Sequence, residues 1–304
     1  MLAKLKEFFD RKNSTYIIML FPAVIILLVY AYVPLAGLII AFQKFIPSKG
    51  LFGAQKWIGL DNFKYLFSMP DSLSVIKNTF VISFLKLTTS LIVPVVLAIL
   101  INEIRKAKLK KFIQTAIYMP HFVSWVILSA ILIEILSPST GIVNYLLKGM
   151  GIEPIFFLAS NKWFVPVLVI SELWKECGFS SVIYLAAITN ISPELYESAV
   201  MDGANRFKQA IYITVPCIAG TIVLMMIIKL GTVLDAGFEQ VFNLYNTQVY
   251  ETGDILDTFI YRIGIQNAQY GLASAAGFFK SCVSLIFVSV SYWTAYKVAD
   301  YKVF

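Results

Sequence analysis

The chain has 304 residues, of which 59% are hydrophobic and 14% are charged, and its mean hydropathy is +0.77. Because soluble domains carry about 25% charged residues, this composition excludes an ordinary soluble enzyme or binding module and indicates an integral membrane protein. The net charge of +7 does not indicate a nucleic-acid partner, because membrane proteins keep excess lysine and arginine in their cytoplasmic loops.

The basic N-terminal segment MLAKLKEFFDRKNSTY leads directly into the first apolar run, residues 16–42. This run is too long for the apolar part of a signal peptide, and no small-residue cleavage site closes it, so we expect an uncleaved first span. Before it, Leu2, Leu5, Phe8 and Phe9 predict a short amphipathic helix on the inner membrane surface.

Five further apolar runs follow, and each is long enough to cross a membrane as a helix. About 20 helical residues cross a hydrocarbon core that is ~30 Å thick. The runs are too long and continuous for barrel strands, and backbone groups cannot remain unpaired in lipid, so the sequence predicts an all-α membrane protein. The six predicted spans are residues 16–42, 78–101, 112–136, 164–189, 216–236 and 271–297.

Lysine and arginine counts set the orientation of these spans. With the N-terminus inside, the inner segments hold 13 of these residues and the outer loops hold 8, and the contrast is sharpest in the short loop NEIRKAKLKK. We therefore expect both termini to be cytoplasmic. The predicted organisation is a single transmembrane domain over 1–304, with a cytoplasmic segment at 1–15, four spans within 16–189, a cytoplasmic loop at 190–216, and two spans with a short tail in 217–304.

The cytoplasmic loop contains ELYESAVMDGANRFKQAIYITVP, which is unusually polar for this chain. Ser192 is placed to cap a helix whose first residue is Pro193, where the missing N–H has no cost. Gly203 is a suitable residue to end that helix, and a second helix is expected from Asn205 to Pro216. From these features alone, the segment is either an amphipathic loop lying on its own protein or on lipid, or a helix that binds a partner.

The spacing of this segment resembles the EAA loop of ABC importer permeases, which reads E-A-A, three residues, G, nine residues, I-x-L-P. Here it is Glu197-Ser198-Ala199, Gly203 and Ile213-x-Val215-Pro216, with conservative departures at Ser198 and Val215. Other blocks are similar to the complex-glycan and polysaccharide-type group of these permeases. They include YVPLAGLIIAF (32–42), WIGLDNF (57–63), MPHFVSWV (119–126), GIVN (141–144), FEQVFNLYN (238–246) and AAGFFKS (275–281).

The resemblance implies a type I ABC importer permease with six transmembrane helices, multi-pass in a bacterial cell membrane. It implies a second permease subunit, a dimeric cytoplasmic ABC ATPase and an extracellular solute-binding protein as partners, and a carbohydrate, an oligosaccharide or polysaccharide fragment, as cargo moved by alternating access. The loop would be the coupling helix that contacts the ATPase. The residues assigned to that contact are Tyr196, Glu197, Ala199, Asp202, Gly203 and Ala204. For Glu197, an alternative role is to complement the helix dipole.

Signatures of catalysis are missing from the sequence. There is no G-x-x-x-x-G-K-[ST] loop and no Gly-Lys pair, so the chain cannot bind nucleotide phosphates in the P-loop manner. One histidine, His121, and three cysteines without metal or disulfide spacing indicate no metal, no cofactor and no catalytic residue. Energy is therefore expected from a separate ATPase.

Charged residues within the predicted spans are the remaining signal, since each costs roughly 2.5–3.5 kcal/mol at mid-membrane on insertion scales. They are Lys86, Glu134, Glu172, Lys175, Glu176, Lys229, Asp235 and Lys280. Glu172, Lys175 and Glu176 share one helical face, which fits either a self-paired or partner-contacting structural cluster, or a lining of the translocation path. Aromatic rings near polar groups suit sugars. The residues predicted for the substrate path are Trp125, Glu134, Glu172, Trp174, Lys175 and Tyr184.

Two other functions remain as alternatives. An ion-coupled secondary transporter would account for the charges inside the spans, but it leaves the EAA spacing unexplained, and the sequence has no evident internal repeat. A membrane-embedded enzyme would need a cluster of acidic, Cys/His or Ser-based catalytic groups near one membrane face, and none is evident.

Overall fold

The structure is a computed structural model that describes residues 11–51 and 53–298. The amphipathic helix predicted at the N-terminus and the end of the C-terminal tail lie outside these residues. The described chain is helical apart from one two-stranded sheet. It forms two compact units, one of residues up to Ser68 with Ile260–Phe278, and one of Met69–Phe259 with residues from Phe279 onward.

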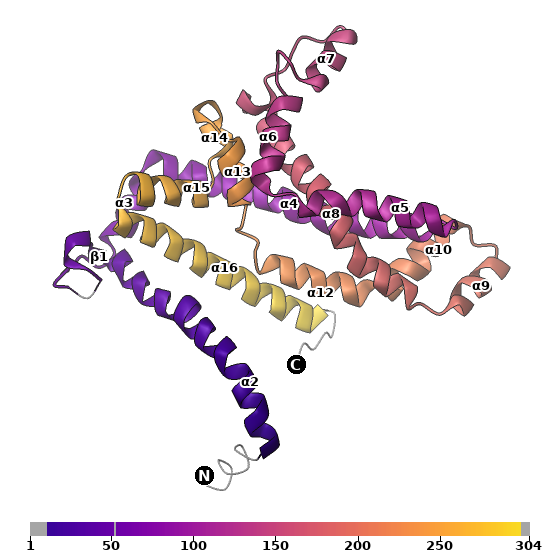
Figure 1. Ribbon diagram of the computed structural model, residues 1–304, viewed down its shortest axis with the longest axis horizontal. Helices are drawn as coiled ribbons and strands as arrows, with labels where there is room; N and C mark the ends of the chain where they lie inside the picture. The colour runs from indigo at the N-terminus through magenta and orange to yellow at the C-terminus, as the bar shows by residue number, and fades with distance from the viewer. Residues whose placement is uncertain (1–10, 52, 299–304) are drawn as a thin grey trace. The chain divides into compact units, whose positions relative to one another are not determined.

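The α-helices follow one another along nearly the whole described chain (Figure 1). They are α2 (Arg11–Leu27), α3 (Asp61–Ser68), α4 (Pro70–Asn102), α5 (Ala107–Tyr118), α6 (Trp125–Ile135), α7 (Ile142–Gly149), α8 (Phe164–Thr189), α9 (Pro193–Met201), α10 (Arg206–Gln209), α11 (Val215–Cys217), α12 (Ala219–Leu230), α13 (Phe238–Leu244), α14 (Tyr250–Gly253), α15 (Leu256–Tyr261) and α16 (Tyr270–Val298). The π-helical turns are Leu28–Tyr32, Ala210–Thr214 and Arg262–Gln266, and the 3₁₀ turns are Val33–Phe42, Pro47–Lys49, Met119–Phe122, Phe157–Ala159 and Thr247–Val249.

The first unit begins with α2, which continues through a π turn and a 3₁₀ segment as far as Phe42. Strand β1 (Gln43–Lys44) then pairs antiparallel with β2 (Lys56–Trp57). The Phe42 ring stacks on that of Trp57 at a centroid distance of 5.7 Å and lies 5.4 Å from that of Phe63. This aromatic cluster joins the end of the preceding 3₁₀ segment to β2 and to α3.

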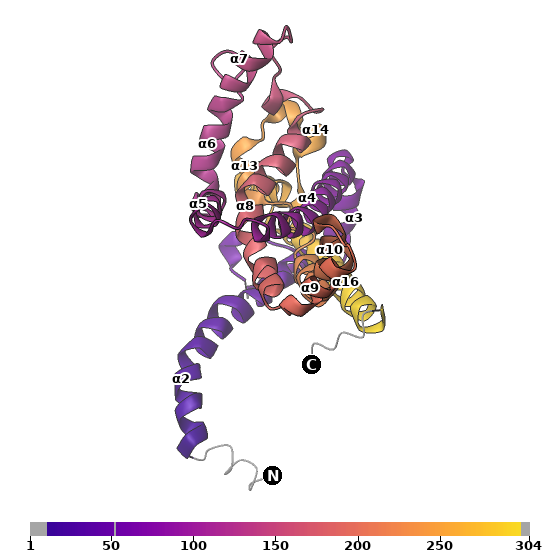
Figure 2. The same cartoon turned by 90° about the vertical axis from the view of Figure 1, so that its right-hand side faces the viewer.

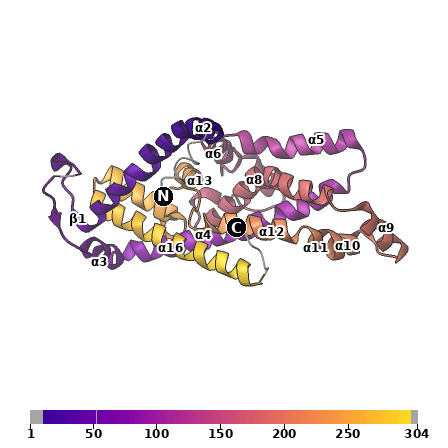
Figure 3. The same cartoon turned by 90° about the horizontal axis from the view of Figure 1, so that it is seen from below.

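The second unit is organised around α4 and α8, which lie side by side along much of their length (Figures 1 and 3). Apolar side chains fill two clusters between these helices and the segments that cover them. One cluster contains Ile82, Phe164, Leu168, Ala236, Val241, Leu244, Val249 and Ile255. The other contains Val95, Ala98, Ile101, Tyr184, Leu185, Ile188 and Ile218. The two clusters lie toward opposite ends of the pair, so the middle of α4 and α8 is left for polar residues.

The third predicted span, 112–136, is not one straight helix but is broken after Pro120. Helices α5 and α6 are bent by 102° at a short break, and α6 turns steeply away from α5 (Figure 2). The break follows from Pro120, which has no N–H to donate, and Val123, which is extended with ψ at 132°. Ser124 then caps α6, with its Oγ accepting from the N–H of Ile127.

By length and composition, three helical stretches are able to cross a membrane, namely Thr15–Phe42, Pro70–Asn102 and Tyr270–Trp293. Two bent pairs, α5 with α6 and the α10–α11 stretch with α12, bring the number of candidate spans to five. Helix α8 has the same bounds as the predicted fourth span, and it carries three charged residues near its middle. By length and composition, the part of the chain that the structure describes therefore contains three to five apolar candidate spans.

Candidate functional site

Helix α9 is a short helix with well-formed ends. Ser192 is the N-cap residue, although its side chain makes no capping bond, and Pro193 is the first helical residue. At the other end Gly203 has φ at +76°, which glycine adopts without steric cost. The N–H of Gly203 donates to the carbonyl of Val200 at 3.0 Å, and that of Ala204 donates to the carbonyl of Ala199 at 2.8 Å. These two bonds form a Schellman motif that fixes the corner after α9.

Side chains connect α9 to the segment after it, and one ion pair connects that segment to the turn after α4. The Tyr196 hydroxyl lies 2.9 Å from Oγ1 of Thr214. Gln209 is buried and donates from Nε2 to the carbonyl of Ala204 at 3.0 Å. Arg206 lies 3.5 Å from Glu103, in the turn after α4. The corner is therefore held as one piece rather than as a free loop.

The predicted coupling residues differ in exposure. Glu197, Asp202 and Gly203 are exposed, and the other three, Tyr196, Ala199 and Ala204, are half-buried against the unit. No residue of α9 is fully buried. The sequence prediction missed three exposed apolar side chains on the same helix, Leu195, Val200 and Met201, of which Met201 is 87% exposed. Helix α9 therefore presents both acidic and apolar groups to its surroundings, as expected of a helix that docks on another protein.

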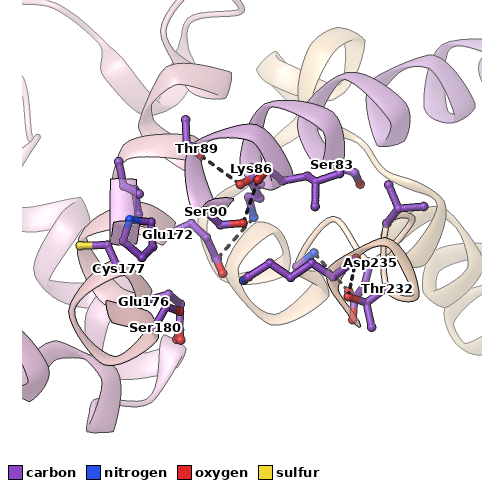
Figure 4. A pocket seen from close by; sticks show the side chains of 16 residues that line it. Ser83, Lys86, Thr89, Ser90, Glu172, Glu176, Cys177, Ser180, Thr232 and Asp235 are labelled. Atoms are coloured by element: carbon purple, nitrogen blue, oxygen red, sulfur yellow. Dashed lines mark hydrogen bonds and ion pairs between the residues drawn. The ribbon is translucent and has the colours of Figure 1, made fainter. Parts of the chain in front are cut away.

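A cavity of about 310 Å³ lies in the middle of the second unit, lined by α4, α8, α12 and the residues that follow α12 (Figure 4). Its charged lining residues are Lys86, Glu172, Glu176, Lys229 and Asp235. The hydroxyl side chains around it are Ser83, Thr89, Ser90, Ser180 and Thr232. Such a mixture of charges and hydroxyls within a membrane domain is typical of a water-filled path.

Lys86 joins three elements at one wall of this cavity. Its Nζ donates to the carbonyl of Ala236 at 2.7 Å and to Oε1 of Gln240, and lies 3.5 Å from Oε2 of Glu172. Gln240 in turn donates to the carbonyl of Leu168 at 2.8 Å, so α4, α8 and α13 meet at this ammonium group. Gly237 has φ at +85°, and a Cβ there would lie 2.8 Å from Nζ of Lys86. Glycine is therefore needed where the backbone passes the lysine.

Glu176 joins the cavity to the bend between α5 and α6. Its Oε2 lies 2.8 Å from Nδ1 of His121, and its Oε1 lies 3.3 Å from Nζ of Lys175. Lys175 also donates to the carbonyl of His121 at 2.6 Å and lies 5.8 Å from the centre of the Trp125 ring. The His121 ring stacks on Phe179 at a centroid distance of 4.1 Å. Lys175 thus supplies a donor to the His121 carbonyl at the helix break, and Glu176 is paired with both Lys175 and His121.

Of the six residues predicted for the substrate path, Glu172 lines the cavity. Lys175 and Trp125 lie beside it in the His121 cluster. Glu134 accepts a hydrogen bond from Thr140 in an exposed position. Trp174 is 51% exposed on the outside of α8, whereas Tyr184 is fully buried in the apolar cluster.

The other charged lining residues, Lys86, Glu176, Lys229 and Asp235, were recognised in the sequence only as charges inside spans. Helical periodicity shows which residues share a face of α8, but it does not show which faces of α4 and α12 are opposite that face. In the sequence, only their charge marked these residues. That they line one cavity follows from the packing of three helices, which the sequence did not predict.

Known proteins resemble the chain over nearly its whole length. It is 42% identical to the polygalacturonan/rhamnogalacturonan transport system permease protein YteP of Bacillus subtilis (strain 168), over 93% of this chain and 88% of that protein. It is 38% identical to LplB of the same organism, over 91% and 87%. A chain in the crystal structure of a bacterial ABC transporter involved in import of the acidic polysaccharide alginate has a TM-score of 0.89 and 40% identity, with 97% and 99% covered.

A second structure of the alginate transporter, in complex with an alginate pentasaccharide-bound periplasmic protein, matches with a TM-score of 0.89 and 39% identity, over 98% of this chain and 99% of that one. Residues 90–299 match the model of a family described as the binding-protein-dependent transport system inner membrane component. This region contains the cavity-lining part of α8 and the whole of α9. The resemblance inferred from the EAA spacing is thus confirmed, and the chain belongs to the family of binding-protein-dependent transport system inner membrane components.

Proposed function

We propose that this permease is one of two membrane subunits of an ATP-driven importer, and that it moves a carbohydrate into the cytoplasm by alternating access. A cytoplasmic ABC ATPase dimer would supply the energy, and an extracellular solute-binding protein would deliver the cargo. Family membership supports this assignment. The absence of a P-loop in the sequence agrees with it, because the energy must then come from another chain.

The geometry of α9 is the observation on which the mechanism rests. Its corner is fixed by two backbone hydrogen bonds and by Gly203, while its acidic and apolar side chains point away from the unit. We propose that α9 is the coupling helix, with Glu197, Asp202 and Gly203 at the ATPase contact together with the exposed Val200 and Met201. Closure of the ATPase dimer would displace a rigid element of this kind as a whole, whereas a flexible loop would absorb the motion.

The membrane topology belongs to the same proposal. We propose six spans, in which the bent α5–α6 pair and the bent stretch ending in α12 each count as one, and α8 is the sixth. The charges of α8 support its place inside the bundle, because Lys175 is buried and Glu172 faces the cavity. With Lys and Arg concentrated at 102–111, both termini and α9 would lie in the cytoplasm.

The relatives point to the class of cargo. YteP is named for polygalacturonan and rhamnogalacturonan, and the structural neighbour is involved in import of the acidic polysaccharide alginate. Both are at least 40% identical to this chain. We therefore propose an oligosaccharide that carries carboxylate groups as the first cargo to test.

The test is reconstitution of the chain with its second permease, ATPase and binding protein in liposomes. We expect uptake of an acidic oligosaccharide that requires both ATP inside the cytoplasmic compartment and the binding protein outside. Uptake by this chain alone, driven by a proton gradient and independent of the ATPase, would instead support an ion-coupled secondary transporter and refute the proposal.

A further inference from the structure

We propose that the cavity between α4, α8 and α12 is a carboxylate-selective saccharide site, in which the ammonium group of Lys229 binds the carboxylate of one acidic sugar residue. The inference rests on the proposed function and adds to it the residue that would select for a negatively charged cargo. It starts from the five charged side chains around the cavity and from the partners that each of them has.

Four of these charges are already engaged. Lys86 is held by Ala236, Gln240 and Glu172, and Glu176 is paired with Lys175 and His121. Asp235 accepts a hydrogen bond from the N–H of Gly237 at 3.3 Å. Within the protein, Lys86 thus neutralises the carboxylate of Glu172, and Lys175 neutralises that of Glu176.

Lys229 differs from the other lysines of this region. It lines the cavity and is half-buried, and within residues 11–51 and 53–298 no carboxylate lies within 4.0 Å of its Nζ. Its position in the last turn of α12 complements the helix dipole, but this effect is several times smaller than the cost of a charge in a membrane span. The charge of this lysine is therefore stabilised if water and an anionic ligand reach it through the cavity.

Two buried polar atoms at the same cavity also lack hydrogen-bond partners. Oγ of Ser83 belongs to a side chain that is 4% exposed, and Oε2 of Glu172 has only the ion pair with Lys86. Buried polar atoms normally have a hydrogen-bond partner, and a water molecule or a ligand hydroxyl in the cavity would supply the missing partner of these two. A sugar hydroxyl both donates and accepts, and it therefore satisfies a serine and a carboxylate equally well.

The size and charge of the cavity limit the kind of ligand that it can bind. A volume of about 310 Å³ is at the lower end of the range for ligand pockets, ~300–1,000 Å³, so it suits one or two sugar rings rather than a long chain. Asp235 repels an anionic group, whereas Lys229 attracts it. The two together would orient an acidic sugar with its carboxylate toward α12 and its hydroxyls toward α4 and α8.

The experiment measures equilibrium binding of trigalacturonate and of trigalactose, which has no carboxylate, to the permease–ATPase complex in nanodiscs without the binding protein. Lys229→Gln is expected to weaken trigalacturonate binding by at least about tenfold, the lower limit for loss of one hydrogen bond to a charged group, and to leave trigalactose binding unchanged. Lys229→Arg should retain the preference. Lys148→Gln, which removes an exposed lysine from α7, controls for loss of charge.

Equal weakening of both sugars, an unchanged preference in Lys229→Gln, or no binding of trigalacturonate by the wild-type complex would overturn the assignment of this site. Uptake by the wild-type complex in liposomes is measured in parallel. ATP-dependent uptake with an unchanged binding preference refutes the Lys229 site alone, and absence of uptake refutes the proposed function.

Discussion

Replacing Gly203 tests whether coupling depends on the fixed backbone conformation of the corner after α9. Alanine would meet no atom within 4 Å at this position, so its cost is limited to the left-handed backbone, about 1–2 kcal/mol. Asparagine tolerates this conformation better. Proline cannot adopt φ at +76°, and it also removes the N–H that bonds to Val200. We therefore expect Gly203→Asn to transport nearly normally, Gly203→Ala to be mildly impaired, and Gly203→Pro to lose coupling.

The measurement is the ratio of sugar imported to ATP hydrolysed by the reconstituted complex, together with the amount of ATPase that copurifies with the permease. The lost hydrogen bond contributes ~0.5–1.5 kcal/mol, and the forbidden backbone angle adds more, so the proline variant should lose the native corner altogether. Normal coupling in Gly203→Pro, with the ATPase bound in normal amount, would refute the view that this corner transmits the motion.

Three further changes test the rest of the site. Glu197→Lys should lower both the amount of ATPase that copurifies and the coupling ratio. Ser198→Lys, at the adjacent position, should have a smaller effect. Equal effects of the two variants would argue against a specific role for the Glu197 carboxylate. Lys86→Met leaves Glu172 without its ion pair, and since that carboxylate is 27% exposed we expect a loss near the lower end of ~3–5 kcal/mol, measured as a lower Tm of the complex, with Lys148→Met unchanged. Glu172→Leu should alter sugar uptake while ATPase copurification stays normal, and unaltered uptake would assign Glu172 a purely structural role.

The sequence predicted best those features that depend on the residues of a single helix. The predicted span 164–189 has the same bounds as α8, because a mostly apolar stretch with few turn formers ends at Asn190 and Ser192. The corner at Gly203 was likewise predictable, since a helix start at Pro193 and a glycine ten residues later leave few other conformations.

The size of the bend between α5 and α6 could not be predicted from apolar content, because hydropathy says nothing of the contacts that residues elsewhere in the chain make with the break. A proline within a span is often accommodated by a kink. Here the break is 102°, and it is stabilised by Lys175 and Glu176 of α8, some 55 residues later in the chain. The size of the bend is therefore set by tertiary contacts. The cavity also could not be predicted without tertiary contacts, because its walls come from three helices.

The fold suggests how α9 and the cavity act on one another. Glu176 lies 13 residues before the end of α8, about 20 Å along a helix that rises 1.5 Å per residue, and three residues then lead into α9. Gly178 packs so closely on α5 that a Cβ there would clash with the carbonyl oxygen of Ile117. If α9 is the coupling helix, we therefore expect its displacement to move α8 and α5 together rather than to bend one of them. Because Glu172 and Glu176 belong to α8 while Lys229 belongs to α12, we expect that any shift of α8 relative to α12 changes the spacing of charges around the cavity, and with it the affinity for an anionic sugar.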